Sequence, residues 1–155
     1  MALSPRNENA GRLPDHEELL LDYTQRVERH LEGRRAVHLH LSQLRSEHRR
    51  PHYIRVAANS FSDLVNDYEG QIFQLRNNDL IVIVKNATHG QIDQVVLRLR
   101  YLFAEDPLAD DDGSSKSFCS WYDLQTDYGR FYTDVRAIYR AYEEGPAGFR
   151  YIPLN

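Results

Sequence analysis

Apolar residues along this chain recur with two different spacings, and each spacing predicts a different kind of element. The first apolar stripe recurs every fourth residue and consists of Leu19, Tyr23, Val27 and Leu31. It predicts a helix over about 15–32, with Asp15 and Glu18 at capping-box spacing and Gly33 at its end. From 36 to 44 the period changes to two, which predicts the first strand.

The clearest pattern is a hairpin followed by a helix. Two apolar runs, 71–76 and 80–85, flank Asn77-Asn78-Asp79, and Asn and Asp suit a short turn because they tolerate left-handed backbone angles. Thr88 and Gln91 then have capping-box spacing. The residues that follow form the strongest amphipathic pattern of the chain: Ile92, Val95, Val96, Leu99, Leu102 and Phe103.

The remaining segments are less regular. We expect a loop over 45–52, a helix over 57–68 that is irregular near its middle and is capped by Gly70, and a flexible excursion over 105–117. A short aromatic strand over 118–124 and a last helix from about 131 to Gly145 complete the pattern. Residues 1–13 are expected to be a flexible leader, and 146–155 either a tail packed on the domain or the start of a further segment.

The resulting order is helix, strand, helix, hairpin, helix, strand, helix. Strands joined by helical crossovers around a central antiparallel hairpin predict an α/β (α+β) fold of the ferredoxin-like or palm type. We expect a single domain over 14–145, with a sheet of four to five strands packed with helices.

Composition narrows the class of protein. The 155 residues are 41% hydrophobic and 27% charged, which is typical of a globular domain, and one domain fits this length. A net charge of -4 offers no general attraction for nucleic acid or an anionic membrane. Cys119 is the single cysteine, and neither a signal peptide nor a membrane span is recognisable, so we expect a cytoplasmic protein without nucleic-acid partners or membrane insertion.

Three stretches carry a resemblance to a known family: 37–41 as the first strand, 61–65 before the hairpin, and 76–84 as the hairpin itself. Together with the order of elements they resemble a diverged GGDEF domain, the diguanylate cyclase module of bacterial signalling proteins. The resemblance covers roughly half of the chain by pattern, without an invariant motif. It implies a cytoplasmic signalling role in bacteria.

Departures from the family pattern bear on catalysis. Two-metal phosphoryl chemistry needs carboxylates near the end of the first strand and in the hairpin turn. This chain offers Ser42, Gln43 and Leu44 at the first place and only Asp79 at the second. We therefore predict that it is not an enzyme and holds no cofactor or metal. Arg76 and Asp79 also spell the family's Arg-x-x-Asp inhibitory motif for cyclic di-GMP, but within the turn itself, and the hairpin alone explains them.

Two histidines, His38 and His40, emerge on one face of the first strand, a spacing that also occurs in metal sites. His48 and His52 are close in sequence, yet no carboxylate or cysteine with ligand spacing completes a set. A solvated, partner-facing or ligand-facing surface is therefore favoured over a metal site, which stays the alternative.

One basic and aromatic cluster spans 45–53. Its candidate ligand contacts are Arg45, Arg49, Arg50 and His52, together with Arg76 and Asp79. The cluster either grips a nucleotide or phosphorylated ligand at the mouth of the sheet or is a solvated loop, and the acidic chain favours the loop. Trp121 and Tyr122 either belong to the core or, with the histidine pair, form an interface with a partner.

Two further features have plain explanations. Asp110 to Asp112 resemble the start of a calcium loop but lack its alternating spacing and closing Glu, so we expect a solvated charge run. Cys119 is expected to be a small core residue. The function expected from all these patterns is a non-catalytic, GGDEF-like interaction or regulatory module that acts through a protein partner or by self-association as a homodimer. The alternative is a sensor that binds a nucleotide or a small phosphorylated ligand through the 45–53 cluster.

Overall fold

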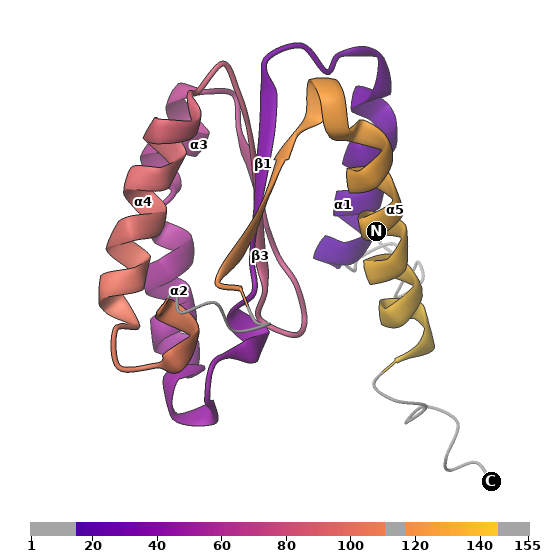
Figure 1. The fold of residues 1–155 in the computed structure, drawn as a ribbon. Coiled ribbons are helices and arrows are strands. Elements are labelled where there is room, and N and C mark those ends of the chain that lie inside the picture. The colour runs from indigo at the N-terminus through magenta and orange to yellow at the C-terminus, as the bar shows by residue number, and fades with distance from the viewer. Residues whose placement is uncertain (1–14, 111–116, 146–155) are drawn as a thin grey trace, which may run out of the picture.

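A four-stranded antiparallel sheet forms the centre of the molecule in the computed structural model, which describes residues 15–110 and 117–145 (Figure 1). Its strands are β1 Arg34–Leu39, β2 Gln71–Gln74, β3 Leu80–Lys85 and β4 Cys119–Asp123. They lie in the order β2-β3-β1-β4, and each neighbouring pair is antiparallel. This order is that of the split β-α-β arrangement, so the predicted fold class is confirmed.

Helices cover both faces of the sheet. They are α1 His16–Arg26, α2 Pro51–Asn59, α3 Ser62–Asp67, α4 His89–Leu102 and α5 Leu124–Glu144. Figure 1 shows α2, α3 and α4 on one side of the sheet and α1 and α5 on the other. Short 3-10 turns lie at Val27–Arg29, Leu41–Gln43, Ser46–His48 and Pro107–Ala109.

Each face of the sheet has its own hydrophobic core, because neighbouring side chains of a strand point to opposite faces. In β1, Val37 and Leu39 join the core under α2, α3 and α4, whereas Ala36 joins the core under α1 and α5. The central strand β3 is buried from Leu80 to Val84, as a strand covered on both faces must be.

The predicted hairpin and the predicted helix after it are both confirmed. Asn78 has a φ of 81°, and the backbone N–H of Asp79 donates to Asn77 Oδ1 at 2.9 Å, which closes the turn. Before α4, the N–H of Gln91 donates to Thr88 Oγ1 at 3.1 Å and the N–H of Thr88 donates to Gln91 Oε1 at 2.8 Å. The turn and the capping box therefore fix where both elements begin.

The structure corrects several predicted boundaries. Pro51 begins α2, although the sequence suggested a loop up to residue 52, because proline suits the first turn of a helix. The irregularity predicted near the middle of the helix over 57–68 is confirmed as a full break at Ser60 and Phe61, which divides this segment between α2 and α3. β1 ends at Leu39 and gives way to a 3-10 turn, so it is shorter than predicted.

The segment after α4 is also corrected in part. The described residues 105–110 include buried Asp106 and Leu108, so this part is not the flexible excursion that its composition suggested. The N–H of Leu108 donates to Asp106 Oδ1 at 2.8 Å and starts a 3-10 turn. The rest of that prediction, together with those for 1–13 and 146–155, falls almost entirely outside the described residues.

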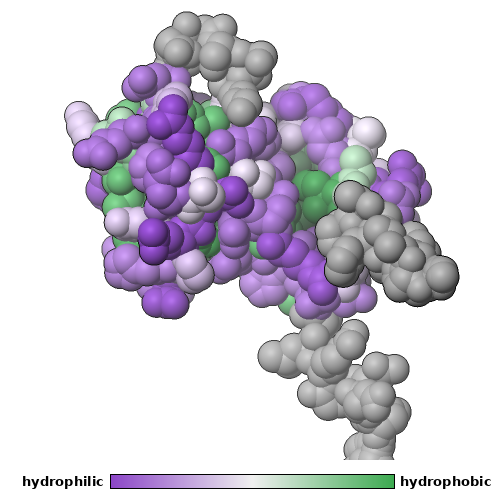
Figure 2. Space-filling model, turned by 90° about the horizontal axis from the view of Figure 1, so that it is seen from below, coloured by the Kyte–Doolittle hydropathy of each residue, from purple (hydrophilic) through white to green (hydrophobic). Residues whose placement is uncertain are grey.

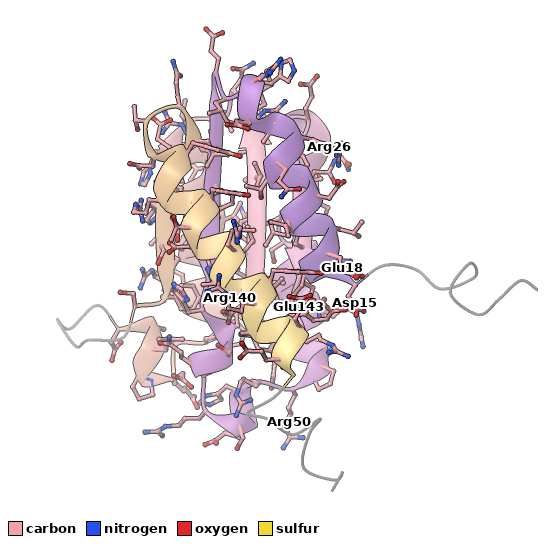
Figure 3. The ribbon with its side chains drawn as sticks, turned by 90° about the vertical axis from the view of Figure 1, so that its right-hand side faces the viewer. Asp15, Glu18, Arg26, Arg50, Arg140 and Glu143 are labelled. Atoms are coloured by element: carbon pink, nitrogen blue, oxygen red, sulfur yellow. The ribbon has the colours of Figure 1, made fainter. Side chains whose placement is uncertain are left out.

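The last helix begins earlier than predicted, at Leu124, and runs antiparallel beside α1. Figure 3 shows Asp15 and Glu18 at the start of α1 next to Glu143 near the end of α5. The hydroxyl of Tyr142 donates to Asp15 Oδ2 at 2.5 Å. Among residues 15–110 and 117–145, no helix has the length and apolar character of a membrane span.

Candidate functional site

The strongest concentration of chemistry in the described part of the chain is a cluster of His38, His40 and Asp79. His38 lies in β1, and Asp79 directly precedes β3. The antiparallel register pairs Leu39 with Leu80, so the residues next to them in sequence meet on the other face of the sheet. The hairpin thus brings a carboxylate to the histidine pair from 41 residues away.

Asp79 is held by two hydrogen bonds in a buried position. Its Oδ2 lies 2.8 Å from His38 Nε2, and its Oδ1 accepts the backbone N–H of Ser42 at 2.7 Å. Asp79 is only 5% exposed, and His38 is only 8% exposed. Burial by itself raises the pKa of Asp79, but the hydrogen bonds from His38 and Ser42 outweigh it and hold the pKa below the ordinary value. Asp79 is therefore a carboxylate at neutral pH.

His40 lies against His38 and contacts the neighbouring strand. The two imidazole rings have centroids 4.2 Å apart, and His40 Nε2 lies 2.8 Å from Ser120 Oγ in β4. Its other ring nitrogen, Nδ1, is 4.0 Å from Asp79 Oδ2. Burial and the nearby His38 lower the pKa of His40, against the opposing effect of Asp79, so the ring is neutral at pH 7.

Two kinds of chemistry use such residues. Ser120, His40 and Asp79 have the order of a hydrolase triad, but the 4.0 Å gap between His40 and Asp79 exceeds a hydrogen bond. Both oxygens of Asp79 already accept from His38 and Ser42, so Asp79 does not orient His40 as a triad requires. Metal binding fits better, because one ligand atom from each of the three residues lies within 4.8 Å of the others.

The sequence predicted that His38 and His40 share a face, and the contact between their rings confirms this. It also suggested a solvated or partner-facing surface and no completing carboxylate. The structure instead buries His38 and supplies Asp79 as its partner. The pairing of β1 with β3, which brings Asp79 to His38, was not recognised from the sequence. A histidine buried on a central strand needs a hydrogen-bond partner, and this requirement was the available signal.

The 45–53 cluster is divided between internal and exposed groups. Arg49 Nε donates to the backbone carbonyl of Leu44 at 2.8 Å, and His48 Nδ1 lies 2.7 Å from the buried Asp106 Oδ2. Arg45, Arg50 and His52 have exposed side chains. Figure 3 shows Arg50 at the lower end of the molecule. The cluster therefore presents fewer free cationic groups than its sequence suggests.

Arg76 and Asp79 do not form one site. The N–H of Arg76 donates to Glu17 Oε2 at 2.7 Å, and its guanidinium lies 5.1 Å from the ring centre of Tyr142 on α5. Asp79 is instead engaged by His38 and Ser42. The Arg-x-x-Asp spelling thus belongs to the hairpin, and each residue contacts a different part of the fold.

The two aromatic residues of β4 differ in exposure. Tyr122 is buried, its hydroxyl donates to Asp134 Oδ2 at 2.7 Å, and burial followed by this hydrogen bond raises its pKa. It therefore belongs to the core and not to an exposed aromatic patch. Trp121 is partly exposed, and its ring lies 4.0 Å from that of His89. Cys119 is partly buried and packs against the core, close to the place of the small core residue that the sequence suggested.

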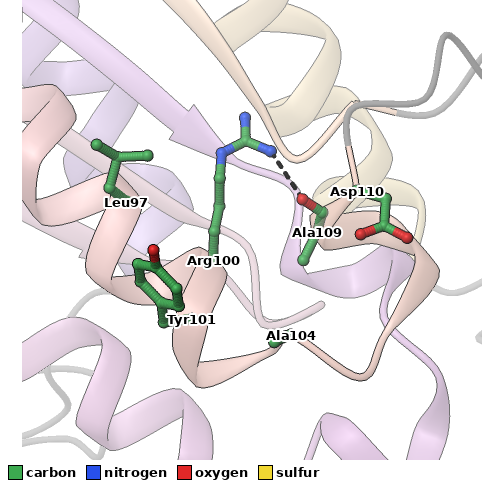
Figure 4. Close-up of a pocket in the computed structure, with 6 residues that line it drawn as sticks. All are labelled: Leu97, Arg100, Tyr101, Ala104, Ala109 and Asp110. Atoms are coloured by element: carbon green, nitrogen blue, oxygen red, sulfur yellow. Dashed lines mark hydrogen bonds between the residues drawn. The ribbon is translucent and has the colours of Figure 1, made fainter.

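A shallow pocket lies between α4 and the 3-10 turn at 107–109 (Figure 4), and no residue of the histidine cluster lines it. It is lined by Leu97, Arg100, Tyr101, Ala104, Ala109 and Asp110. Arg100 Nη1 donates to the carbonyl of Ala109 at 3.1 Å across it. Of the acidic run that resembled a calcium loop, only Asp110 lies within the described residues.

No protein-family model, curated protein or solved structure matches this chain in the comparisons made with known proteins.

Proposed function

We propose that this chain is a non-catalytic, GGDEF-like domain that serves as a protein-interaction or regulatory module in bacterial cytoplasmic signalling. The observation that carries the proposal is the state of the hairpin carboxylate. Asp79 is buried, and both of its oxygens accept hydrogen bonds, from His38 and from Ser42. The order of strands and crossover helices agrees with the resemblance that the sequence suggested.

The ligand chemistry around Asp79 argues against nucleotide cyclisation. Two magnesium ions beside a triphosphate require several hard oxygen ligands from the protein. Among the described residues, the group that could hold a metal contains one carboxylate and two imidazoles. Imidazole nitrogen is a poor ligand for magnesium, so the arrangement does not supply the oxygen ligands of a two-metal site.

Exposed apolar side chains on the outer helices support an interaction role. Tyr101 is 82% exposed and Leu97 is 48% exposed on α4, and Tyr53 and Val56 are also exposed on α2. Figure 2 shows that most of the surface seen from below is hydrophilic, with hydrophobic residues in separate patches. Leu97 and Tyr101 are four residues apart on α4 and line the same pocket, so this face of α4 is the surface that we assign to the contact with another protein.

The catalytic part of the proposal is tested by incubating the purified protein with GTP and Mg²⁺ or Mn²⁺, with an active diguanylate cyclase assayed in parallel. We expect neither GTP consumption nor cyclic di-GMP, measured by chromatography. Turnover that is lost in Asp79→Ala would overturn the proposal, because it would show that the hairpin carboxylate is catalytic.

The interaction part is tested with the double variant Leu97→Ser/Tyr101→Ser. Both side chains are exposed, so the variant should fold as the wild type does. We expect the wild type to associate with itself or with a co-purified partner in sedimentation experiments, and the variant to lose this association. Equal association of the two proteins would exclude the α4 surface.

The alternative, a nucleotide or phosphate sensor, depends on the exposed side chains of Arg45, Arg50 and His52. Calorimetry with GTP, cyclic di-GMP and inorganic phosphate tests it, with Arg45→Ala/Arg50→Ala as the matched variant. Binding that the double variant loses would favour sensing over interaction. No heat with any of the three ligands would exclude these ligands and leave the interaction role as the proposal.

A further inference from the structure

The His38, His40 and Asp79 side chains have a geometry close to that of a metal centre. His38 Nε2 and Asp79 Oδ2 are 2.8 Å apart, and His40 Nδ1 is 4.0 Å from the same oxygen. In a tetrahedral zinc site with bonds near 2.0–2.1 Å, neighbouring ligand atoms are about 3.3 Å apart. These two distances lie on either side of this value and all three ligand atoms lie within 4.8 Å of one another, so side-chain shifts on the order of 1 Å would bring the three ligands onto one ion.

The ligand types select a class of metal. Two imidazoles and one carboxylate suit Zn²⁺ and related transition metals, whereas Mg²⁺ and Ca²⁺ prefer oxygen ligands throughout. Coordination through Nε2 of His38 replaces its hydrogen bond to Asp79, so the proton on that nitrogen moves to Nδ1 or to solvent as the metal binds.

Supporting contacts orient two of the three ligands. Ser120 Oγ lies 2.8 Å from His40 Nε2, and when that nitrogen carries the proton, the lone pair of Nδ1 faces Asp79. The Ser42 N–H fixes the other oxygen of Asp79 at 2.7 Å. Metal-binding histidines and carboxylates commonly have such partners, which hold the ring or the carboxylate in its coordinating orientation.

We propose that His38, His40 and Asp79 bind one Zn²⁺-class ion, which joins β1 to the β2–β3 hairpin. The site links residues that are 41 positions apart in sequence, and it neighbours β4 through Ser120. Binding to the folded chain alone stabilises it by mass action. The proposal goes beyond the non-catalytic role above and does not depend on it, since the GTP assay and metal binding are measured separately.

The experiment is a calorimetric titration of metal-stripped protein with ZnCl₂ alone, followed by thermal unfolding with and without the ion. We expect one Zn²⁺ per chain, and a rise in Tm of about 5–10 °C at a free concentration a hundred times Kd. MgCl₂ under the same conditions should leave Tm unchanged. No heat and no Tm shift with ZnCl₂ would overturn the proposal.

Matched variants test the ligands. His40→Ala and Asp79→Asn should each weaken zinc binding at least tenfold, and Ser120→Ala about tenfold through loss of orientation. His30→Ala is the control, because His30 is an exposed histidine outside the cluster, and its affinity should equal that of the wild type. Unchanged affinity in both His40→Ala and Asp79→Asn would place the zinc elsewhere and overturn the proposal.

Asp79→Asn alters a buried group, so circular dichroism must show that the variant is folded before its affinity is used. A second measurement on the wild type alone avoids this problem. Titration with Co²⁺ should give the visible ligand-field absorption of a four-coordinate nitrogen and oxygen site, and Zn²⁺ should displace it. A spectrum identical to that of Co²⁺ in buffer would contradict the proposed coordination.

Discussion

Two histidine and aspartate pairs in this molecule have nearly the same geometry but different surroundings. His38 and Asp79 are 2.8 Å apart, and His48 and Asp106 are 2.7 Å apart. Asp106 also accepts the N–H groups of Arg45 and Leu108, each at 2.8 Å, so backbone donors occupy it. Asp79 accepts a single backbone N–H and has a second histidine beside it.

In these two pairs the additional contacts of the carboxylate, and not its contact with the histidine, determine what the buried carboxylate does. Asp106 is a structural anchor that fixes the segment before α2 to the turn at 107–109, because its acceptor capacity is spent on backbone groups. Asp79 accepts one hydrogen bond on each oxygen and belongs to a group of three residues that could hold a metal ion. One pair therefore holds two loops together, and we propose the other as a metal site.

The largest expected effect is that of Asp106→Ala. Removing this carboxylate leaves the N–H groups of Arg45 and Leu108 without an acceptor, so we expect a loss of about 3 kcal/mol in the free energy of unfolding. Urea denaturation measures it. Glu105→Ala, at an exposed neighbouring position, is the control and should change stability by less than about 0.5 kcal/mol. Equal losses of stability in Asp106→Ala and Glu105→Ala would show that Asp106 is not a structural anchor.

The second prediction concerns the pH dependence of the same anchor. Burial raises the pKa of Asp106, but the hydrogen bonds from His48, Arg45 and Leu108 outweigh it and hold the pKa below its ordinary 3.8. A lowered folded pKa contributes stability above the unfolded value, and this contribution is lost as pH falls through the folded value. The advantage of wild type over Asp106→Asn should therefore be full at about pH 7 and should shrink toward about pH 3.

Urea midpoints of both proteins at several pH values measure this difference. A constant difference between wild type and Asp106→Asn across the whole range would show that the charge of Asp106 does not contribute.

The third prediction separates the two pairs directly. His48→Gln should cost about 1 kcal/mol of stability, because the two backbone donors still satisfy Asp106. It should leave zinc affinity unchanged, whereas His38→Gln should weaken zinc binding at least tenfold. Urea denaturation and zinc calorimetry on both variants provide the check. A loss of zinc affinity in His48→Gln would mean that the two pairs are not independent.

The smallest expected effect is that of Ser120→Ala on the metal-free protein. The hydroxyl contacts one nitrogen of a histidine whose side chain is still 20% exposed, so its loss should change stability by about 0.5 kcal/mol. The same variant should bind zinc about tenfold more weakly. Urea denaturation of the metal-stripped protein, followed by zinc titration, distinguishes a positioning role from a purely structural one.

Local patterns predicted the parts of the fold that local chemistry determines. The turn at Asn77 and Asn78 and the capping box of Thr88 were recognisable because each depends on residues within a few positions of one another. Pro51 was misread because proline is equally common in loops and in the first turn of a helix. The sequence alone does not decide between these two roles.

The site was predictable only in part, because its members meet through the sheet. His38 and His40 were singled out by their spacing, but Asp79 reaches them only through the pairing of β1 with β3. Asp106 lay in a segment whose composition indicated flexibility, and its contact with Arg45 spans 61 positions. Contacts between residues so far apart in the chain produce no recognisable pattern within a short stretch of sequence.

The antiparallel pairing of α1 with α5 has a mechanical consequence. Because Tyr142 near the end of α5 contacts Asp15 at the start of α1, residues 15 and 145 lie at the same end of the molecule. A force that pulls on both residues would peel the two helices apart one turn at a time before it strains the strands. The central sheet would thus be shielded from tension transmitted along the chain.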